Sequence, residues 1–298
     1  MSEPKENKGH AVDPMECVEY KKCPPSEWPE WAIPFIRRLE RLRMEGKDTS
    51  VPTSKKHVSE LLHKKFPPIQ ACVPGFLSSG LAILAGRPHS GVSLLALQLA
   101  LSVATGEPFL GHFPTKKGWV QYYALECGEK QLQNRLNALG FKNLGEGDRR
   151  RFRYDTTLEP GTPLENLITR AAMLIEIANS FHATPTLPFR LFVLDTMDNA
   201  LLWNVVDYDK HESLYGWLVD MNRLAEEMNM TILFVHHMRK NWMSDPLDRI
   251  FGPEGVYGAC ETSLLLERVR LCVFSRHAEE QRVVLEREGV RWKYVDKC

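Results

Sequence analysis

Apolar residues in this chain gather in short runs, separated by longer segments in which they recur every three or four positions. Short runs are typical of buried strands, and the periodic segments are typical of helices that cover a sheet. The predicted strands are 81–85, 119–126, 189–196 and 230–237, and the predicted helices are one that ends at residue 106 and those at 128–139, 163–181 and 212–228. Strands that alternate with helices in this way favour a parallel sheet with helices on both faces.

After residue 262 the pattern changes to short, closely spaced runs. They lie at 263–267, 271–276, 282–287 and 292–295. Alternating apolar and polar positions are typical of antiparallel strands, which here extend one edge of the sheet. The predicted fold class is therefore α/β: a mostly parallel sheet covered by helices on both faces, with antiparallel strands added at the C-terminal edge.

The chain divides into an N-terminal part and a main domain. Residues 1–26 are polar and proline-containing, which predicts a disordered or extended arm. Residues 27–65 carry tryptophans and then a basic helical stretch, which either packs on the main domain or contacts DNA phosphates, a neighbouring subunit or another protein. Residues 66–298 form the main domain, whose first segment, 66–79, is a proline-rich lead-in. The arginines in 149–153 are interpreted as the solvated entrance of a strand.

Composition excludes some classes of protein. Of the 298 residues, 43% are hydrophobic and 26% are charged, and the formal net charge is zero, so the chain has no overall basic signature for nucleic acid. The seven cysteines show no CxxC pairing and are interpreted as reduced thiols. Neither a signal peptide nor an apolar run long enough to span a membrane is evident. The sequence predicts a soluble, cytoplasmic protein without a membrane partner.

The first predicted strand runs into a glycine turn and then into a long apolar helix. A helix that begins this way is a ready anion site, because its first N–H groups are unpaired and its dipole is positive there. The phosphate-binding loop pattern is G-x-x-x-x-G-K-[ST]. The candidate nucleotide-binding residues are Gly86, Arg87, Pro88, His89, Ser90, Gly91, Val92, Ser93 and Leu94. Both glycines and the hydroxyl are present, but Val92 stands where the pattern has lysine.

Three other strands end on polar residues. Glu126, Asp195 and the pair of His236 and His237 each lie at a strand's carboxyl end, where open α/β sheets place their chemistry. Nucleotide hydrolysis needs a hydroxyl and a carboxylate for Mg²⁺ and an acid that orients water, and Ser93, Asp195 and Glu126 fit these roles. His237 is a candidate sensor of the γ-phosphate. Each residue also has a structural alternative: strand-end acids often cap helices or form turns, and His236 is expected to face the sheet packing.

These motifs resemble those of the RecA-like P-loop ATPases of the plasmid RepA helicase group, or AAA-25 family. The resemblance covers about residues 66–295 and includes AGRPHSGVSLL, VQYYALE, FRLFVLDT, TILFVHHMRK and GPEGVYGACETSLLLER. It implies a RecA-type core, a homo-oligomeric and often hexameric ring, ATP with Mg²⁺, and work on DNA in the replication of plasmids, phages or other mobile elements. It also implies Ser93 and Asp195 at the metal, Glu126 as catalytic acid or base, and His237 as the phosphate sensor.

The chain departs from the family pattern in its positive charges. Val92 cannot make the charge-assisted bond of the missing lysine, a bond worth about 1.5–3 kcal/mol. His89 or Arg87 could supply some charge from another direction. The segment 255–260, where relatives carry a base for the next subunit, holds Tyr257 and no base. The alternative candidates for that base are Arg239, Lys240 and Arg249.

Three functions follow as hypotheses. The first is a nucleotide-binding, hydrolysis-impaired relative that acts as a regulatory or DNA-associated subunit, in other words a pseudo-ATPase. The second is an active hexameric ATPase or DNA helicase that uses a substitute cation. The third is a non-enzymatic interaction module with a vestigial loop, in which Trp28 and Trp31 help bind a protein partner.

Overall fold

The computed structural model describes residues 58–65, 70–158, 163–180, 187–199, 211–238, 245–250 and 256–295. Its contacts divide the chain into two units, Met1–Phe66 and Pro67–Cys298. In the first unit the described element is helix α2 (Val58–His63), which has no buried residue. The extended arm and the tryptophans expected at 27–57 lie outside the described residues.

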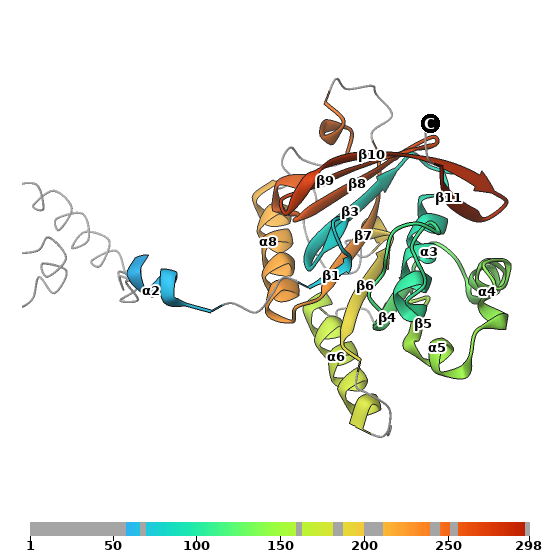
Figure 1. The fold of residues 1–298 in the computed structure, drawn as a ribbon, viewed down its shortest axis with the longest axis horizontal. Helices are drawn as coiled ribbons and strands as arrows, with labels where there is room; N and C mark the ends of the chain where they lie inside the picture. Colours follow the sequence, from blue (N-terminus) through green and yellow to red (C-terminus); the bar gives the residue numbers. More distant parts are fainter. Residues whose placement is uncertain are drawn as a thin grey trace, which may run out of the picture. The chain divides into compact units, whose positions relative to one another are not determined.

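The main unit is built on a nine-stranded sheet in the order β11-β10-β9-β8-β3-β7-β6-β4-β5 (Figure 1). Six neighbouring strands of this sheet pair in parallel. They are β3 (Gly80–Gly86), β4 (Trp119–Ala124), β5 (Phe152–Asp155), β6 (Phe189–Asp195), β7 (Thr231–His237) and β8 (Thr262–Glu267). The remaining strands β9 (Arg270–Ser275), β10 (Ala278–Glu288) and β11 (Arg291–Val295) are antiparallel and extend the edge beside β8. The predicted α/β class is confirmed.

Helices cover both faces of this sheet (Figure 1). They are α3 (Val92–Thr105), α4 (Glu129–Ala138) and α5 (Glu146–Arg151), then α6 (Leu164–Ser180) and α8 (His211–Glu227). Successive strand residues point to opposite faces, so Leu84 joins a core with α3 and α4 while its neighbour Ile83 joins a second core with α6 and α8. Burial on both sides explains why the central strands read as continuous apolar runs.

Short elements complete the main unit. Three single turns of 3-10 helix lie at Phe141–Asn143, Leu247–Arg249 and Val256–Ala259. The lead-in at 66–79 contains a small antiparallel pair, β1 (Ala71–Val73) with β2 (Leu77–Ser78), which its prolines did not suggest.

Two sequence interpretations need correction. The first C-terminal strand, β8, was expected to be antiparallel, but it pairs in parallel with β3 and is buried at all but its last position. A strand inside the sheet is covered on both faces and therefore need not alternate. The arginines expected to introduce a strand lie partly in a helix: Arg149–Arg151 form the last turn of α5, where they favour the negative end of the helix dipole. The strand itself begins at Phe152.

Candidate functional site

The candidate site begins at the turn between β3 and α3. β3 ends at Gly86 and α3 begins at Val92, with Gly91 as the N-terminal cap at φ 89° and ψ 20°. This left-handed conformation favours glycine, which has no Cβ to crowd the backbone. The amide of Ser90 donates to the carbonyl of Arg87 at 3.0 Å, which closes the turn. The chain therefore forms the strand-loop-helix unit that the motif predicted.

The inner side of this loop is tightly packed. A Cβ added at Gly86 would lie 2.7 Å from Ser90 Oγ and 3.0 Å from Val92 Cβ, so glycine is required at this point. Ser90 Oγ is buried and, within the described part of the chain, has no hydrogen-bond partner. Buried polar atoms are nearly always paired. An unpaired hydroxyl inside a glycine loop at a helix N-terminus therefore fits a loop that binds an anion.

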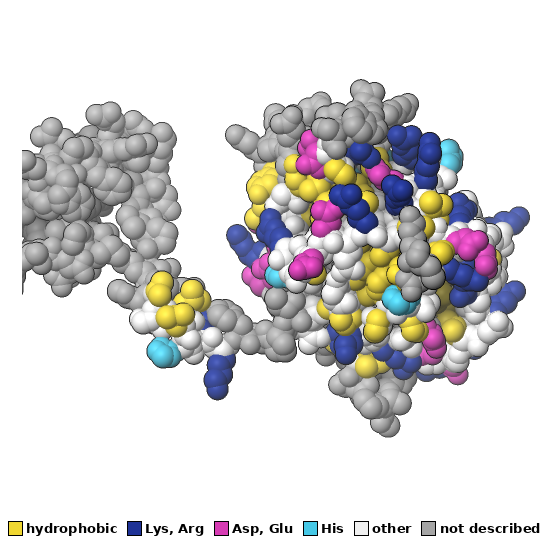
Figure 2. All heavy atoms as spheres, turned by 45° about the horizontal axis from the view of Figure 1, so that its top comes forward, with side chains coloured by type: hydrophobic (Ala, Val, Ile, Leu, Met, Phe, Trp, Pro, Cys, Tyr) yellow, Lys and Arg dark blue, Asp and Glu magenta, His cyan; other side chains and the backbone are white. Residues whose placement is uncertain are grey.

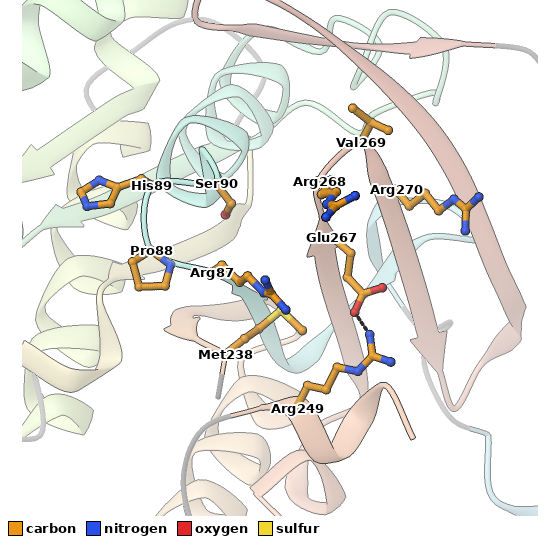
Figure 3. Close-up of a pocket in the computed structure, with 10 residues that line it drawn as sticks. All are labelled: Arg87, Pro88, His89, Ser90, Met238, Arg249, Glu267, Arg268, Val269 and Arg270. Carbon is orange, nitrogen blue, oxygen red and sulfur yellow. Dashed lines mark hydrogen bonds and ion pairs between the residues drawn. The ribbon is translucent and has the colours of Figure 1, made fainter. Parts of the chain in front are cut away.

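Val92 removes the usual positive charge from this loop. Its side chain is 6% exposed and belongs to the apolar core under α3. Arg87 and His89 are exposed, and Figure 3 shows them pointing in different directions, Arg87 into a neighbouring cavity and His89 away from it. Neither of these side chains takes the place of a lysine inside the loop.

That cavity has a volume of about 670 Å³ and lies beside the loop (Figure 3). Its lining combines residues 87–90 of the loop and Met238 with Arg249, Glu267, Arg268, Val269 and Arg270. Arg249 pairs with Glu267, so it is not the free base sought for a neighbouring subunit. Lys and Arg side chains gather over the upper part of the main unit in Figure 2. The surroundings of the loop are therefore basic although its interior is not.

The structure brings Ser93 and Asp195 together. Ser93 Oγ donates to Asp195 Oδ1 at 2.9 Å, and Tyr122 Oη donates to Asp195 Oδ2 at 2.7 Å. Asp195 is 2% exposed. Burial raises the pKa of its carboxyl to about 6, although the two hydrogen bonds act in the opposite direction. Sequence reasoning missed Tyr122, which is buried and lies on β4 next to β6.

This raised pKa predicts a pH dependence for Mg²⁺. Below about pH 6 Asp195 is protonated and cannot hold the cation, so Mg²⁺-dependent nucleotide binding is expected to strengthen as the pH rises from 5 to 7. The same carboxyl favours the folded state at low pH, because its folded pKa lies above the unfolded value of 3.8; this contribution is lost as the pH rises through 6. Calorimetric titration of Mg·ATP at both pH values tests the binding. In Asp195→Asn the difference between pH 5 and pH 7 should disappear.

Glu126 and His237 also lie together. Thr196 Oγ1 donates to Glu126 Oε1 at 3.1 Å, and His237 Nε2 lies 3.7 Å from the same oxygen. The Glu126 side chain is 39% exposed and the His237 side chain 31%, so solvent reaches both. His236 is fully buried, as expected for a residue facing the sheet packing.

Asp198 holds His237 from the other side, a contact that sequence reasoning missed. Asp198 Oδ2 lies 2.8 Å from His237 Nδ1 and 3.4 Å from His236 Nδ1. Burial alone would raise the pKa of Asp198, but its contacts with the two histidines lower it to about 2. An ionised carboxylate only accepts hydrogen bonds, so Nδ1 of His237 donates to it and Nε2 is directed at Glu126. Asp198 thus orients the imidazole.

Comparison with known proteins places this site in a family. The chain matches the AAA domain family AAA_25 over residues 48–243, which is more than half of its length, and it belongs to this family. The predicted resemblance to RecA-like P-loop ATPases of the RepA and AAA_25 type is therefore confirmed. Members of this class bind nucleotide and Mg²⁺ in general. No curated protein matches the chain.

Two solved structures have a similar fold. The ATPase domain of a helicase aligns with a TM-score of 0.50 and 11% identity, covering 73% of this chain and 85% of that one. The KaiC-like protein PH0186 from the hyperthermophilic archaeon Pyrococcus horikoshii OT3 aligns with a TM-score of 0.49 and 14% identity, covering 77% of this chain and all of that one. At these identities the likeness concerns the fold alone.

Two predictions about partners are left as they were. Among the residues that the structure describes, every helix is too short or too polar to cross a membrane. Arg239 and Lys240, two of the alternative bases for a neighbouring subunit, lie outside the described residues. Tyr257 is described, and its Oη lies 3.5 Å from Asp248 Oδ1.

Proposed function

We propose that this protein is a cytoplasmic, RecA-like ATP-binding protein that binds Mg·ATP weakly and hydrolyses it slowly or not at all. The observation that carries this proposal is the loop at 86–93, which has an unpaired buried hydroxyl at Ser90 but a buried valine in place of the lysine. Ser93 and Asp195 would hold Mg²⁺, since a P-loop hydroxyl and a strand-end carboxylate are its usual protein ligands. The bound cation would neutralise charge on the phosphates.

The residues for hydrolysis are present in this proposal, but the charge is reduced. Glu126 would orient or deprotonate the attacking water, and His237, oriented by Asp198, would contact the terminal phosphate. Transition-state charge in phosphoryl transfer is stabilised mainly by cations and hydrogen bonds at the phosphates. Loss of the lysine therefore impairs chemistry more than it impairs folding of the loop.

The cellular role follows from the family resemblance. We propose that the protein acts with DNA in replication or in the maintenance of mobile elements, as a homo-oligomer and in a ring of six if it follows its relatives. The basic cavity beside the loop supports contacts with phosphates. Contacts with DNA or with a protein partner through residues 27–65 belong to the same proposal.

A second candidate is an active ATPase or helicase with a substitute cation. It is favoured by the assembled group of Glu126, His237 and Asp198, which a vestigial site would have no physical reason to keep. The third candidate, an interaction module without nucleotide, depends on Trp28 and Trp31 and therefore on residues outside the described part of the chain.

One set of measurements separates the three. Calorimetry measures ATP binding by the full chain with and without Mg²⁺, and phosphate release is followed with single-stranded DNA present. We expect weak, Mg²⁺-dependent binding with little release. Robust release that disappears in Glu126→Gln supports the active enzyme instead. Absence of any binding overturns the proposal and leaves the interaction module.

A further inference from the structure

The C-terminal hairpin of β10 and β11 lies against the start of α3. Trp292, on β11, is 2% exposed and exchanges two hydrogen bonds with the side chain of Gln98, at 2.8 and 2.9 Å. Its indole Nε1 donates to the carbonyl of Gly91 at 3.3 Å. The hairpin is therefore fixed to the last residue of the loop that we propose binds phosphate.

Arg287 lies next to Trp292 on the same face of this hairpin. The two residues are direct partners in the antiparallel pair, so their side chains share one face. The guanidinium carbon lies 5.7 Å from the centre of the indole ring, and Nε donates to the carbonyl of Gly289 at 2.9 Å. A Cβ placed on Gly91 would lie 3.1 Å from Arg287 Nη1. The charged group thus lies at the flank of the loop.

Nothing in the described part of the chain neutralises Arg287 by an ion pair. Its neighbours Glu286 and Glu288 alternate to the other face of the strand, and Glu288 pairs with Lys293 at 2.5 Å. Arg282, on the same strand, does pair with Glu280 at 2.7 Å. Arg287 is exposed but held by an aromatic ring and a backbone carbonyl, so its charge is both available and oriented.

We infer that Arg287 supplies, from the same chain, the positive charge that Val92 removes from the loop. Its guanidinium binds phosphate oxygens of the nucleotide at the flank of Gly91, where a planar group with two Nη atoms can make paired hydrogen bonds. Arg87 and Arg268 line the neighbouring cavity, and Figure 3 shows Arg270 pointing away from the loop. This inference rests on the proposed function and identifies the ligand group as a phosphate and not the base.

The test compares Arg287→Ala and Arg287→Gln with Arg282→Ala, a matched arginine on the same strand that makes no contact with the loop. Calorimetric titration with Mg·ATP is expected to show binding about tenfold weaker for both Arg287 variants and unchanged binding for Arg282→Ala. Arg287→Gln keeps length and a hydrogen-bond donor but not the charge, so a loss shared with alanine identifies the charge as the cause. Thermal unfolding of each variant shows whether the hairpin stays in place.

A second arm removes the need for Arg287. In a Val92→Lys background the loss on Arg287→Ala is expected to shrink, because the lysine returns charge to the same phosphates; a merely structural arginine would show no such coupling. Equal losses in the two backgrounds, unchanged binding in Arg287→Gln, or an equal loss in Arg282→Ala overturn the inference alone. A parent protein that binds no ATP overturns the proposed function, and the inference falls with it.

Discussion

Replacing Val92 with lysine is expected to tighten Mg·ATP binding by about 10- to 100-fold. Val92 Cβ lies 3.0 Å from the point where a Gly86 Cβ would lie, so a side chain at position 92 starts on the inner side of the loop. A lysine from this position can reach a phosphate and form a charge-assisted hydrogen bond, worth about 1.5–3 kcal/mol. Calorimetry at constant ionic strength measures the change. Phosphate release should increase as well.

The control for this variant is Val92→Met, which has similar length and no charge. It is expected to leave the affinity for Mg·ATP close to that of the native chain, because apolar bulk adds no bond to phosphate. Since Val92 belongs to the apolar core, thermal unfolding of both variants must show that α3 remains folded. A folded Val92→Lys protein with unchanged affinity would show that this loop does not hold the phosphates.

The sequence predicted the sheet and the edge that carries the site, because both depend on simple regularities. Runs such as 189–196 are apolar throughout only when both sheet faces are covered, which indicates parallel strands. The carboxyl ends of parallel strands share one edge, so Glu126, Asp195 and His237 were expected to be neighbours. The distances of Ser93 from Asp195 and of Glu126 from His237 agree with that expectation. The roles of these residues stay predictions.

Other contacts could not be predicted because they depend on register and loop geometry. Asp198 follows β6 by three residues, and its pairing with His237 depends on the turn that follows the strand. Tyr122 reads as an ordinary core residue until the pairing of β4 with β6 brings its hydroxyl to Asp195. Arg287, between two glutamates, reads as a solvated charge. Only the alternation of the strand separates it from those acids, and only the hairpin brings it to Gly91.

In the Val92→Lys protein, changing Glu126 to glutamine is expected to slow phosphate release by about 10²- to 10⁴-fold, the usual contribution of a general base. Glutamine keeps the size of the side chain and can still accept the hydrogen bond of Thr196, but its amide cannot take a proton from water. Binding of Mg·ATP should therefore change little. Single-turnover measurement of phosphate release, together with calorimetry, separates the two effects.

Glu129→Gln provides the matched control, because Glu129 is an exposed carboxylate in the first turn of α4, only three residues further along the chain. Its loss should leave release unchanged. Equal slowing in both variants would point to the general electrostatic field and not to a base at Glu126. Undiminished release in Glu126→Gln would require another residue to activate the water, and His237 is the nearest described candidate, since its Nε2 lies 3.7 Å from the Glu126 carboxylate. The double variant with His237→Ala would then decide between them, because proton acceptance by the imidazole would be lost with the ring.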